Sequence, residues 1–88
     1  MHKFDFKRQA AVITGGAQGF GLDIAKKFLE FGCKVFIWDI DEKLLKMAAN
    51  KINNPNLNYQ VIDVSNYGEV EKIVGEITIE NKIDILIN

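Results

Sequence analysis

A glycine-rich stretch is the first place where this sequence could do chemistry. It runs from Thr14 to Gly21, reads TGGAQGFG, and links an apolar run to an amphipathic one. Glycines in such a turn allow a tight bend, let a pyrophosphate approach the backbone, and let helix and strand pack closely. The N-terminus of the following helix favours an anion. We therefore predict a phosphate-binding loop, and simple close packing is the alternative use of the glycines.

An acidic residue further along the chain predicts the nucleotide that the loop would hold. Asp39 ends an apolar run about 20 residues after the loop, where a carboxylate can accept both hydroxyls of an adenosine ribose. Its charge repels a 2′-phosphate, the loop has no Arg or Lys, and the apolar Ile40 follows. We therefore expect NAD as the cofactor and NADP to be disfavoured. A solvated or helix-capping acid is the alternative for Asp39.

A second acid follows the third apolar run, where Asp63 precedes Val64. An acid beside a small apolar residue at a strand end could meet the amino group and the ring of adenine. Taken alone, the pair is better explained as a turn aspartate. Its weight as a binding feature comes from its place beside the loop and Asp39.

The periodicity of apolar residues predicts the elements that must position these residues. Four apolar residues in a row, Val35 to Trp38, are typical of a strand covered on both faces, as in a parallel sheet. Asp41 and Ser65 are suitable N-caps for the second and third helices, and Gly32 is a suitable end for the first. The expected strands cover residues 9–13, 34–39, 57–64 and 83–88, and the expected helices begin near residues 19, 42 and 66. This alternation predicts an α/β fold, namely the β-α-β-α-β-α-β portion of a Rossmann-type doubly wound parallel sheet.

Length and composition exclude several classes of protein. The 88 residues suffice for one domain, and 48% hydrophobic with 26% charged residues is an ordinary globular composition. A net charge of −1 gives no electrostatic case for nucleic acid or an anionic membrane. No apolar run approaches the roughly 20 residues of a membrane span, and residues 1–8 contain no apolar core of signal-peptide length, so we expect a cytoplasmic protein. The single cysteine, Cys33, excludes an internal disulfide and is expected to be a buried small hydrophobe. We assign no metal site.

These features together resemble the first part of a short-chain dehydrogenase/reductase, of the kind that includes 3-oxoacyl-acyl-carrier-protein reductases. The stretch from Thr14 to Gly21 resembles the TGxxxGxG loop of that family, and Asp39 stands where its NAD-preferring members keep an acid. Asp63-Val64 resembles the adenine-pocket pair, and residues 83–88 resemble the strand that opens the NNAG motif, with Asn88 as its first Asn. Phe20 departs from the Ile or Leu that is usual in the family.

The resemblance implies a role for each candidate residue. The loop residues would line the pyrophosphate and the ribose, while the residues at the ends of the second and third strands would hold the adenosine. The implied cofactor-binding set is Gly15, Gly16, Ala17, Gln18, Gly19, Phe20, Gly21, Asp39, Ile40, Asp63 and Val64.

The family's reaction is hydride transfer between nicotinamide and a carbonyl/alcohol pair. Its catalytic YxxxK motif lies beyond NNAG, and neither Tyr59 nor Tyr67 has a Lys at that spacing, so no catalytic residue is assigned. We expect this chain to be the cofactor-binding part, residues 1–88, of a longer single domain that by family analogy could form homo-oligomers. Two alternatives stay open: an S-adenosylmethionine-dependent methyltransferase, and a non-catalytic nucleotide-binding module.

Overall fold

Four strands alternate with three helices along the chain. The computed structural model describes residues 9–80 and 82–87. The elements are, in order, β1 (Ala10–Thr14), α1 (Gly19–Glu30), β2 (Lys34–Asp39), α2 (Glu42–Ile52), β3 (Leu57–Val61), α3 (Tyr67–Glu80) and β4 (Ile83–Ile87).

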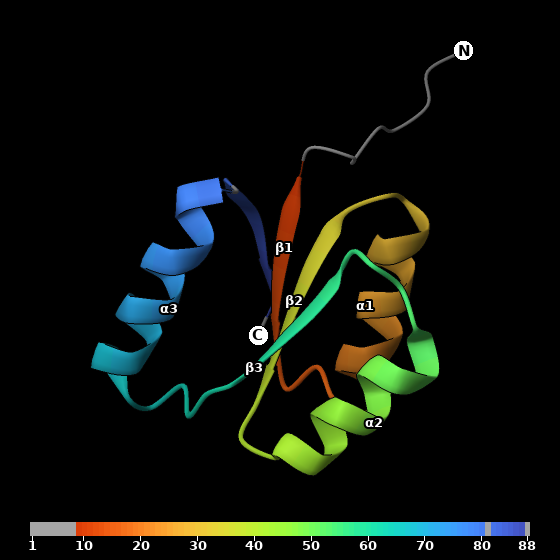
Figure 1. Cartoon of the computed structure of the whole chain (residues 1–88), viewed down its shortest axis with the longest axis horizontal. Coiled ribbons are helices and arrows are strands. Elements are labelled where there is room, and N and C mark those ends of the chain that lie inside the picture. Colours follow the sequence, from red (N-terminus) through yellow and green to blue (C-terminus); the bar gives the residue numbers. More distant parts are fainter. Residues whose placement is uncertain (1–8, 81, 88) are drawn as a thin grey trace.

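The four strands form one parallel sheet with the order β3-β2-β1-β4. The chain moves outward from β1 to β3 and then returns to the other side of β1, so the strand order reverses there. The loops after β1, β2 and β3 all leave the lower edge of the sheet in Figure 1. In open α/β sheets, ligands bind at this carboxyl edge, near the reversal.

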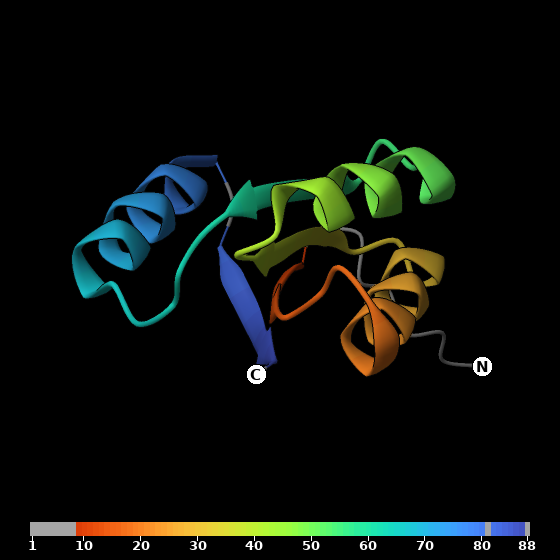
Figure 2. The same ribbon diagram turned by 90° about the horizontal axis from the view of Figure 1, so that it is seen from below.

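The helices cover both faces of the sheet, which confirms the predicted doubly wound fold. Figure 2 shows α1 and α2 on one side of the strands and α3 on the other. One core lies beneath α1 and α2 and contains Ile13, Val35, Ile37 and Leu45. The second lies beneath α3, where Phe36 and Trp38 pack with Val12, Ile62 and Ile77.

Strand β2 shows why its sequence lacks alternation. Val35 and Ile37 belong to the core beneath α1 and α2, whereas Phe36 and Trp38 belong to the core beneath α3. All four are buried because a helix layer covers each face. The interpretation of this run as a two-sided, parallel strand is therefore confirmed.

The helix ends follow from local chemistry that the sequence already contained. Asp41 caps α2, because its Oδ1 accepts a hydrogen bond from the backbone N–H of Leu44 at 3.1 Å. Gly32 follows α1 with a φ of 87°, and Asn53 ends α2 with a φ of 48°. Both residue types adopt this left-handed conformation more readily than other residues.

The predicted third strand and its following cap were wrong in detail. We expected the strand to reach Val64, but β3 ends at Val61. We expected Ser65 to cap the third helix, but Asn66 does so, because its Oδ1 accepts from the backbone N–H of Glu69 at 3.1 Å. Ser65 instead donates its backbone N–H and its hydroxyl to Asp63. A short polar side chain that bonds the local backbone favours a turn over a continued strand.

Two further expectations concern the ends of the sheet and the cysteine. β1 covers Ala10–Thr14, one residue later than the predicted 9–13. Asn88, the expected first residue of an NNAG motif, lies outside the described residues. Cys33 is fully buried, as expected, and its burial together with the negative charge of Asp84 raises the pKa of the thiol.

The core beneath α1 and α2 predicts a large stability difference between two residues of the same helix. Leu45 is fully buried, whereas Met47 is 61% exposed. We expect Leu45→Ala to lower the free energy of unfolding by about 2–5 kcal/mol, since it removes buried methyl groups and leaves a cavity. Met47→Ala should change it by less than about 0.5 kcal/mol. Urea denaturation of both variants measures this, and equal losses would contradict the assigned core.

Candidate functional site

The loop after β1 turns through two backbone conformations that favour glycine. Gly15 has a φ of 64° and Gly19 a φ of 58°, and no atom lies within 4 Å of a Cβ built on either residue. A Cβ at either position would therefore meet no neighbouring atom, and steric crowding does not require glycine here. The left-handed backbone conformation requires glycine, because other residues are strained at positive φ.

Two other glycines are required by close approach. A Cβ on Gly16 would lie 2.7 Å from Cγ2 of Ile37, and a Cβ on Gly21 would lie 2.5 Å from the carbonyl oxygen of Gly15. Without a Cβ at Gly16 the loop packs closely against β2, and without one at Gly21 the first turn of α1 packs closely against the loop. The four glycines thus divide between two physical needs, a turn and a close contact.

The N-terminus of α1 differs from those of the other two helices. Its N-cap, Gln18, is extended and makes no side-chain capping hydrogen bond, and no acidic residue lies in the first turn. In contrast, α2 has the Asp41 cap with Glu42 in its first turn, and α3 has the Asn66 cap with Glu69. α1 therefore has free N–H groups and the unneutralised positive end of a helix dipole, the two features that bind phosphate.

Asp39 lies at the carboxyl end of β2 beside this loop. One carboxylate oxygen, Oδ1, accepts from the backbone N–H of Asp41 at 3.1 Å. Within residues 9–80 and 82–87, no donor contacts the other oxygen, so it can accept a hydrogen bond from a ligand hydroxyl. The next residue, Ile40, is 69% exposed and presents an apolar surface at the same edge.

Asp63 and Val64 lie in the turn that leads from β3 to α3. Oδ1 of Asp63 accepts from the backbone N–H of Ser65 at 2.9 Å and from its hydroxyl at 2.6 Å. These bonds favour the charged form and hold the pKa of Asp63 below its ordinary value. Val64 is 51% exposed.

Backbone hydrogen bonds join these segments across the carboxyl edge. The N–H of Gly16 donates to the carbonyl of Trp38 at 3.2 Å, and the N–H of Ile62 donates to the carbonyl of Asp39 at 3.0 Å. The loop after β1, the end of β2 and the turn after β3 are therefore adjacent. Sequence reasoning placed these segments at one edge but missed the bonds between them, since these depend on strand register.

Apolar side chains are exposed at each of the three segments. Phe20 is 81% exposed in the first turn of α1, and Ile40 and Val64 are also largely exposed. Ala17 is buried, while Gln18 and Gly19 are exposed. An exposed apolar group beside polar acceptors and free N–H groups suits a ligand with a flat ring, ribose hydroxyls and phosphates.

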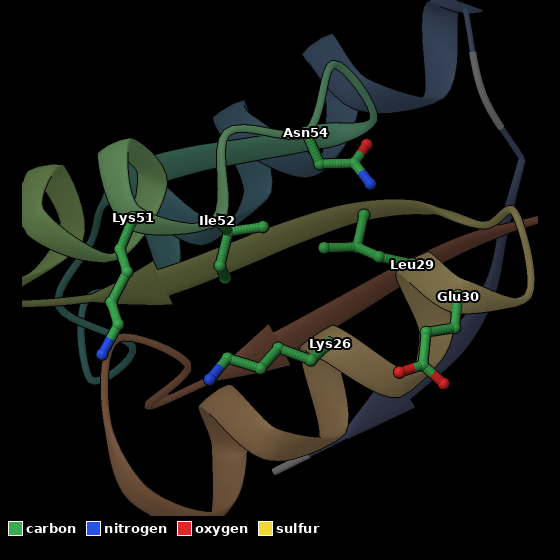
Figure 3. A pocket seen from close by; sticks show the side chains of 6 residues that line it. All are labelled: Lys26, Leu29, Glu30, Lys51, Ile52 and Asn54. Atoms are coloured by element: carbon green, nitrogen blue, oxygen red, sulfur yellow. The ribbon is translucent and has the colours of Figure 1, made fainter.

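A cavity of about 360 Å³ lies apart from this edge, between α1 and α2 (Figure 3). Leu29 and Ile52 form its apolar part, and the amino groups of Lys26 and Lys51 end on the same side in the figure. It also reaches Asn54, which precedes β3, and so belongs to the amino-terminal side of the strands. None of the candidate site residues lines this cavity.

Two other kinds of feature, a metal site and a membrane-spanning helix, are absent from the described part of the chain. Across residues 9–80 and 82–87, no three His, Cys, Asp or Glu side chains gather in a way that could hold a metal ion. No helix in the same residues combines the length and apolar character needed to cross a membrane.

Comparison with known proteins identifies the family. Residues 9–88 match the short chain dehydrogenase family. The chain is 36% identical over 84 residues to 3-oxoacyl-(acyl-carrier-protein) reductase FabG of Chlamydia muridarum, covering 91% of this chain and 34% of that protein. It is 38% identical over 86 residues to an NAD-dependent glycerol dehydrogenase of Listeria innocua, covering 97% and 34%. The chain belongs to the short-chain dehydrogenase/reductase family, whose members bind a nicotinamide dinucleotide.

Solved structures agree with this assignment. A 3-ketoacyl-(acyl-carrier-protein) reductase of Brucella melitensis, in complex with NADH, superposes with a TM-score of 0.82 and 31% identity, covering 93% of this chain and 34% of that one. The chain therefore spans about a third of the length of the relatives that it matches. The family assignment favours a dehydrogenase over the methyltransferase alternative.

The close contact at Gly21 predicts opposite effects for two glycine substitutions in helices. We expect Gly21→Ala to lower the free energy of unfolding by about 1–3 kcal/mol, because the new methyl group overlaps the Gly15 carbonyl. Gly75 lies inside α3, and a Cβ there would meet nothing within 4 Å. Gly75→Ala should therefore raise the free energy of unfolding by up to about 1 kcal/mol. Thermal and urea denaturation compare the two, and a stabilising Gly21→Ala would refute the contact.

The turn after β3 predicts a pKa change. Ser65→Ala should raise the pKa of Asp63 towards its ordinary value, because the hydroxyl bond to the carboxylate is lost. A carboxyl group whose pKa is lower in the folded than in the unfolded protein adds to the free energy of unfolding at a pH above its unfolded pKa. That contribution is lost as the pH falls through the pKa of the folded state. Ser65→Ala should therefore weaken this pH dependence. Carboxyl NMR titration measures the pKa, with Thr78→Ala as a control hydroxyl that bonds within α3.

Proposed function

We propose that this chain supplies the NAD-binding part of an NAD-dependent oxidoreductase that transfers hydride between nicotinamide and a carbonyl/alcohol substrate. The observation that carries the proposal is the N-terminus of α1, the one described helix with neither a side-chain cap nor an acid in its first turn. It lies directly behind a glycine turn at the carboxyl edge of a parallel sheet. This is the arrangement that binds a dinucleotide pyrophosphate.

The loop would hold the pyrophosphate through backbone groups. Gly15 and Gly19 give the turn its path, and Gly16 and Gly21 keep its backbone close to β2 and α1. Gln18 and Phe20 are exposed at the start of α1, where Phe20 would pack beside the cofactor. Since the loop has no cationic side chain, its N–H groups and the helix dipole supply the attraction for phosphate.

The adenosine would lie across the ends of β2 and β3. Asp39 would accept the ribose hydroxyls through Oδ2, the carboxylate oxygen that Asp41 does not engage. Ile40 and Val64 would flank the adenine ring, and Asp63 would meet its amino group. The bonds from Ser65 engage Oδ1 of Asp63, so the other carboxylate oxygen would accept the hydrogen bond from the amino group.

The same aspartate favours NAD over NADP. A 2′-phosphate about 4 Å from the Asp39 carboxylate would cost roughly 4 kcal/mol per unit charge at an effective dielectric of 20, before solvent screening reduces it. The Listeria relative is NAD-dependent and the Brucella relative was solved with NADH, which supports the same choice.

The bound cofactor would supply the hydride chemistry, and the described residues would bind and orient it. No residue of this chain is assigned a catalytic role. The activity of the whole protein and its carbonyl/alcohol substrate are parts of the proposal, drawn from family relatives that are about three times as long. Assembly as a homo-oligomer, by family analogy, and a cytoplasmic location are further parts of it. A non-catalytic nucleotide-binding module is the second candidate, and absence of hydride transfer in an NAD-binding protein would favour it.

Calorimetric titration with NAD and NADP tests the cofactor. We expect NAD to bind at least about tenfold more tightly than NADP, which is about 1.4 kcal/mol. Asp39→Ala should weaken NAD binding by about fivefold to tenfold through the loss of hydrogen bonds to the ribose. It should also reduce the preference for NAD, because the repulsion of a 2′-phosphate disappears.

The matched control is Glu76→Ala, which removes an equal charge from an exposed position on α3 near Lys34, at the amino-terminal end of β2. Both affinities should stay within about twofold in this variant, since surface charges distant from a ligand contribute little. Tighter binding of NADP by the unmodified protein would refute the role of Asp39. Absence of binding of either dinucleotide would refute the proposed site.

A further inference from the structure

Trp38 is the single tryptophan of the chain, and its indole N–H has a defined partner. Nε1 donates to Oε1 of Gln60 at 2.9 Å, across the β2–β3 pair in which the two residues are register partners. The indole is buried in the core beneath α3 with Phe36 and Ile62. Because only 3% of Trp38 is exposed, water is a poor substitute for the Gln60 oxygen.

The backbone of Trp38 belongs to the nucleotide site. Its carbonyl accepts the N–H of Gly16 at 3.2 Å, so it fixes one side of the phosphate loop. The next residue is Asp39, the proposed ribose acceptor. This bond joins the loop to β2 and not to β3, so a displacement of β3 would move the Asp63-Val64 turn relative to Asp39 and leave the loop in place.

Gln60 lies on β3 opposite Trp38, just before the residues proposed to contact adenine. Two residues later, Ile62 donates its N–H to the carbonyl of Asp39 at 3.0 Å, and Asp63 and Val64 follow. β3 is the edge strand of the described sheet and pairs with β2 alone. The position of its carboxyl end thus depends on contacts with β2, and among the described residues the Trp38–Gln60 bond is the side-chain hydrogen bond that joins the two strands.

We propose that Gln60 is a positioning residue for the adenosine end of the nucleotide site and acts through the indole of Trp38. The hydrogen bond fixes the register of β3 at its last ladder positions, and so sets the separation between Asp39 and the Asp63-Val64 turn. A one-residue slip would turn Gln60 to the opposite face and break the bond. The inference rests on the proposed NAD site, and it adds a residue that touches no part of the cofactor.

Gln60→Leu tests the inference, because it keeps the side-chain size and removes the acceptor. Asn58→Leu is the matched control: Asn58 lies two residues earlier on the same strand and face, and Trp38 does not bond to it. The probes are NAD, adenosine monophosphate and inorganic pyrophosphate, titrated by calorimetry at a temperature where far-UV circular dichroism shows all variants folded. Emission of Trp38 reports the indole environment directly.

We expect Gln60→Leu to raise the Kd of NAD and of adenosine monophosphate by about fivefold to tenfold, as for one lost, partly buried hydrogen bond. The Kd of pyrophosphate should change by less than about twofold, since the α1 N-terminus remains in place. Trp38 emission should shift in Gln60→Leu and not in Asn58→Leu. Trp38→Phe removes the hydrogen-bond donor and keeps an aromatic ring, so it should weaken the binding of adenosine monophosphate to the same extent. It replaces Gln60→Leu in the test if that variant does not fold.

Equal losses for adenosine monophosphate and pyrophosphate, or equal losses in Gln60→Leu and Asn58→Leu, would overturn the inference by showing a general effect on the fold. Wild-type affinity in Gln60→Leu or Trp38→Phe would overturn it while the NAD site stands. Absence of NAD binding by the unmodified protein would instead refute the site on which the inference rests.

Discussion

The carboxyl end of β2 is the point on which the candidate site depends. Two successive carbonyls there accept backbone N–H groups from opposite neighbours: that of Trp38 from Gly16, and that of Asp39 from Ile62. Buried backbone groups are costly to leave unpaired, so these bonds hold the loop after β1 and the turn after β3 against one central strand. These bonds to the sheet then set the spacing of the proposed phosphate, ribose and adenine contacts.

The glycine loop shows how a backbone site is specified without side-chain chemistry. Positive φ angles at Gly15 and Gly19 determine its path, while the absence of Cβ atoms at Gly16 and Gly21 allows contacts closer than any other residue permits. Polar side chains cap α2 and α3, and α1 has no such cap. Side chains of the protein therefore accept hydrogen bonds from the N-terminal N–H groups of α2 and α3, whereas those of α1 remain available to a ligand.

Much of this architecture was predictable because it follows from local chemistry. The two-sided burial of β2, the Asp41 cap and the glycine loop need only the periodicity and type of neighbouring residues. The end of β3 and the cap of α3 were wrong, because Asp63 bonds Ser65 and turns the chain before the predicted strand is complete. Contacts between strands, such as that of Trp38 with Gln60, depend on register and on which residues face each other, and these emerge only in three dimensions.

The uncapped N-terminus of α1 links the stability of the protein to the supply of its ligand. In the free protein, the first-turn N–H groups are left to solvent, and part of the possible stabilisation of α1 is unused. A ligand that binds only the folded form adds stability in proportion to the logarithm of its concentration, about 2.7 kcal/mol at a hundred times its Kd. The abundance of the nucleotide in the cell would then set the folded fraction and the lifetime of the protein as well as the occupancy of its site.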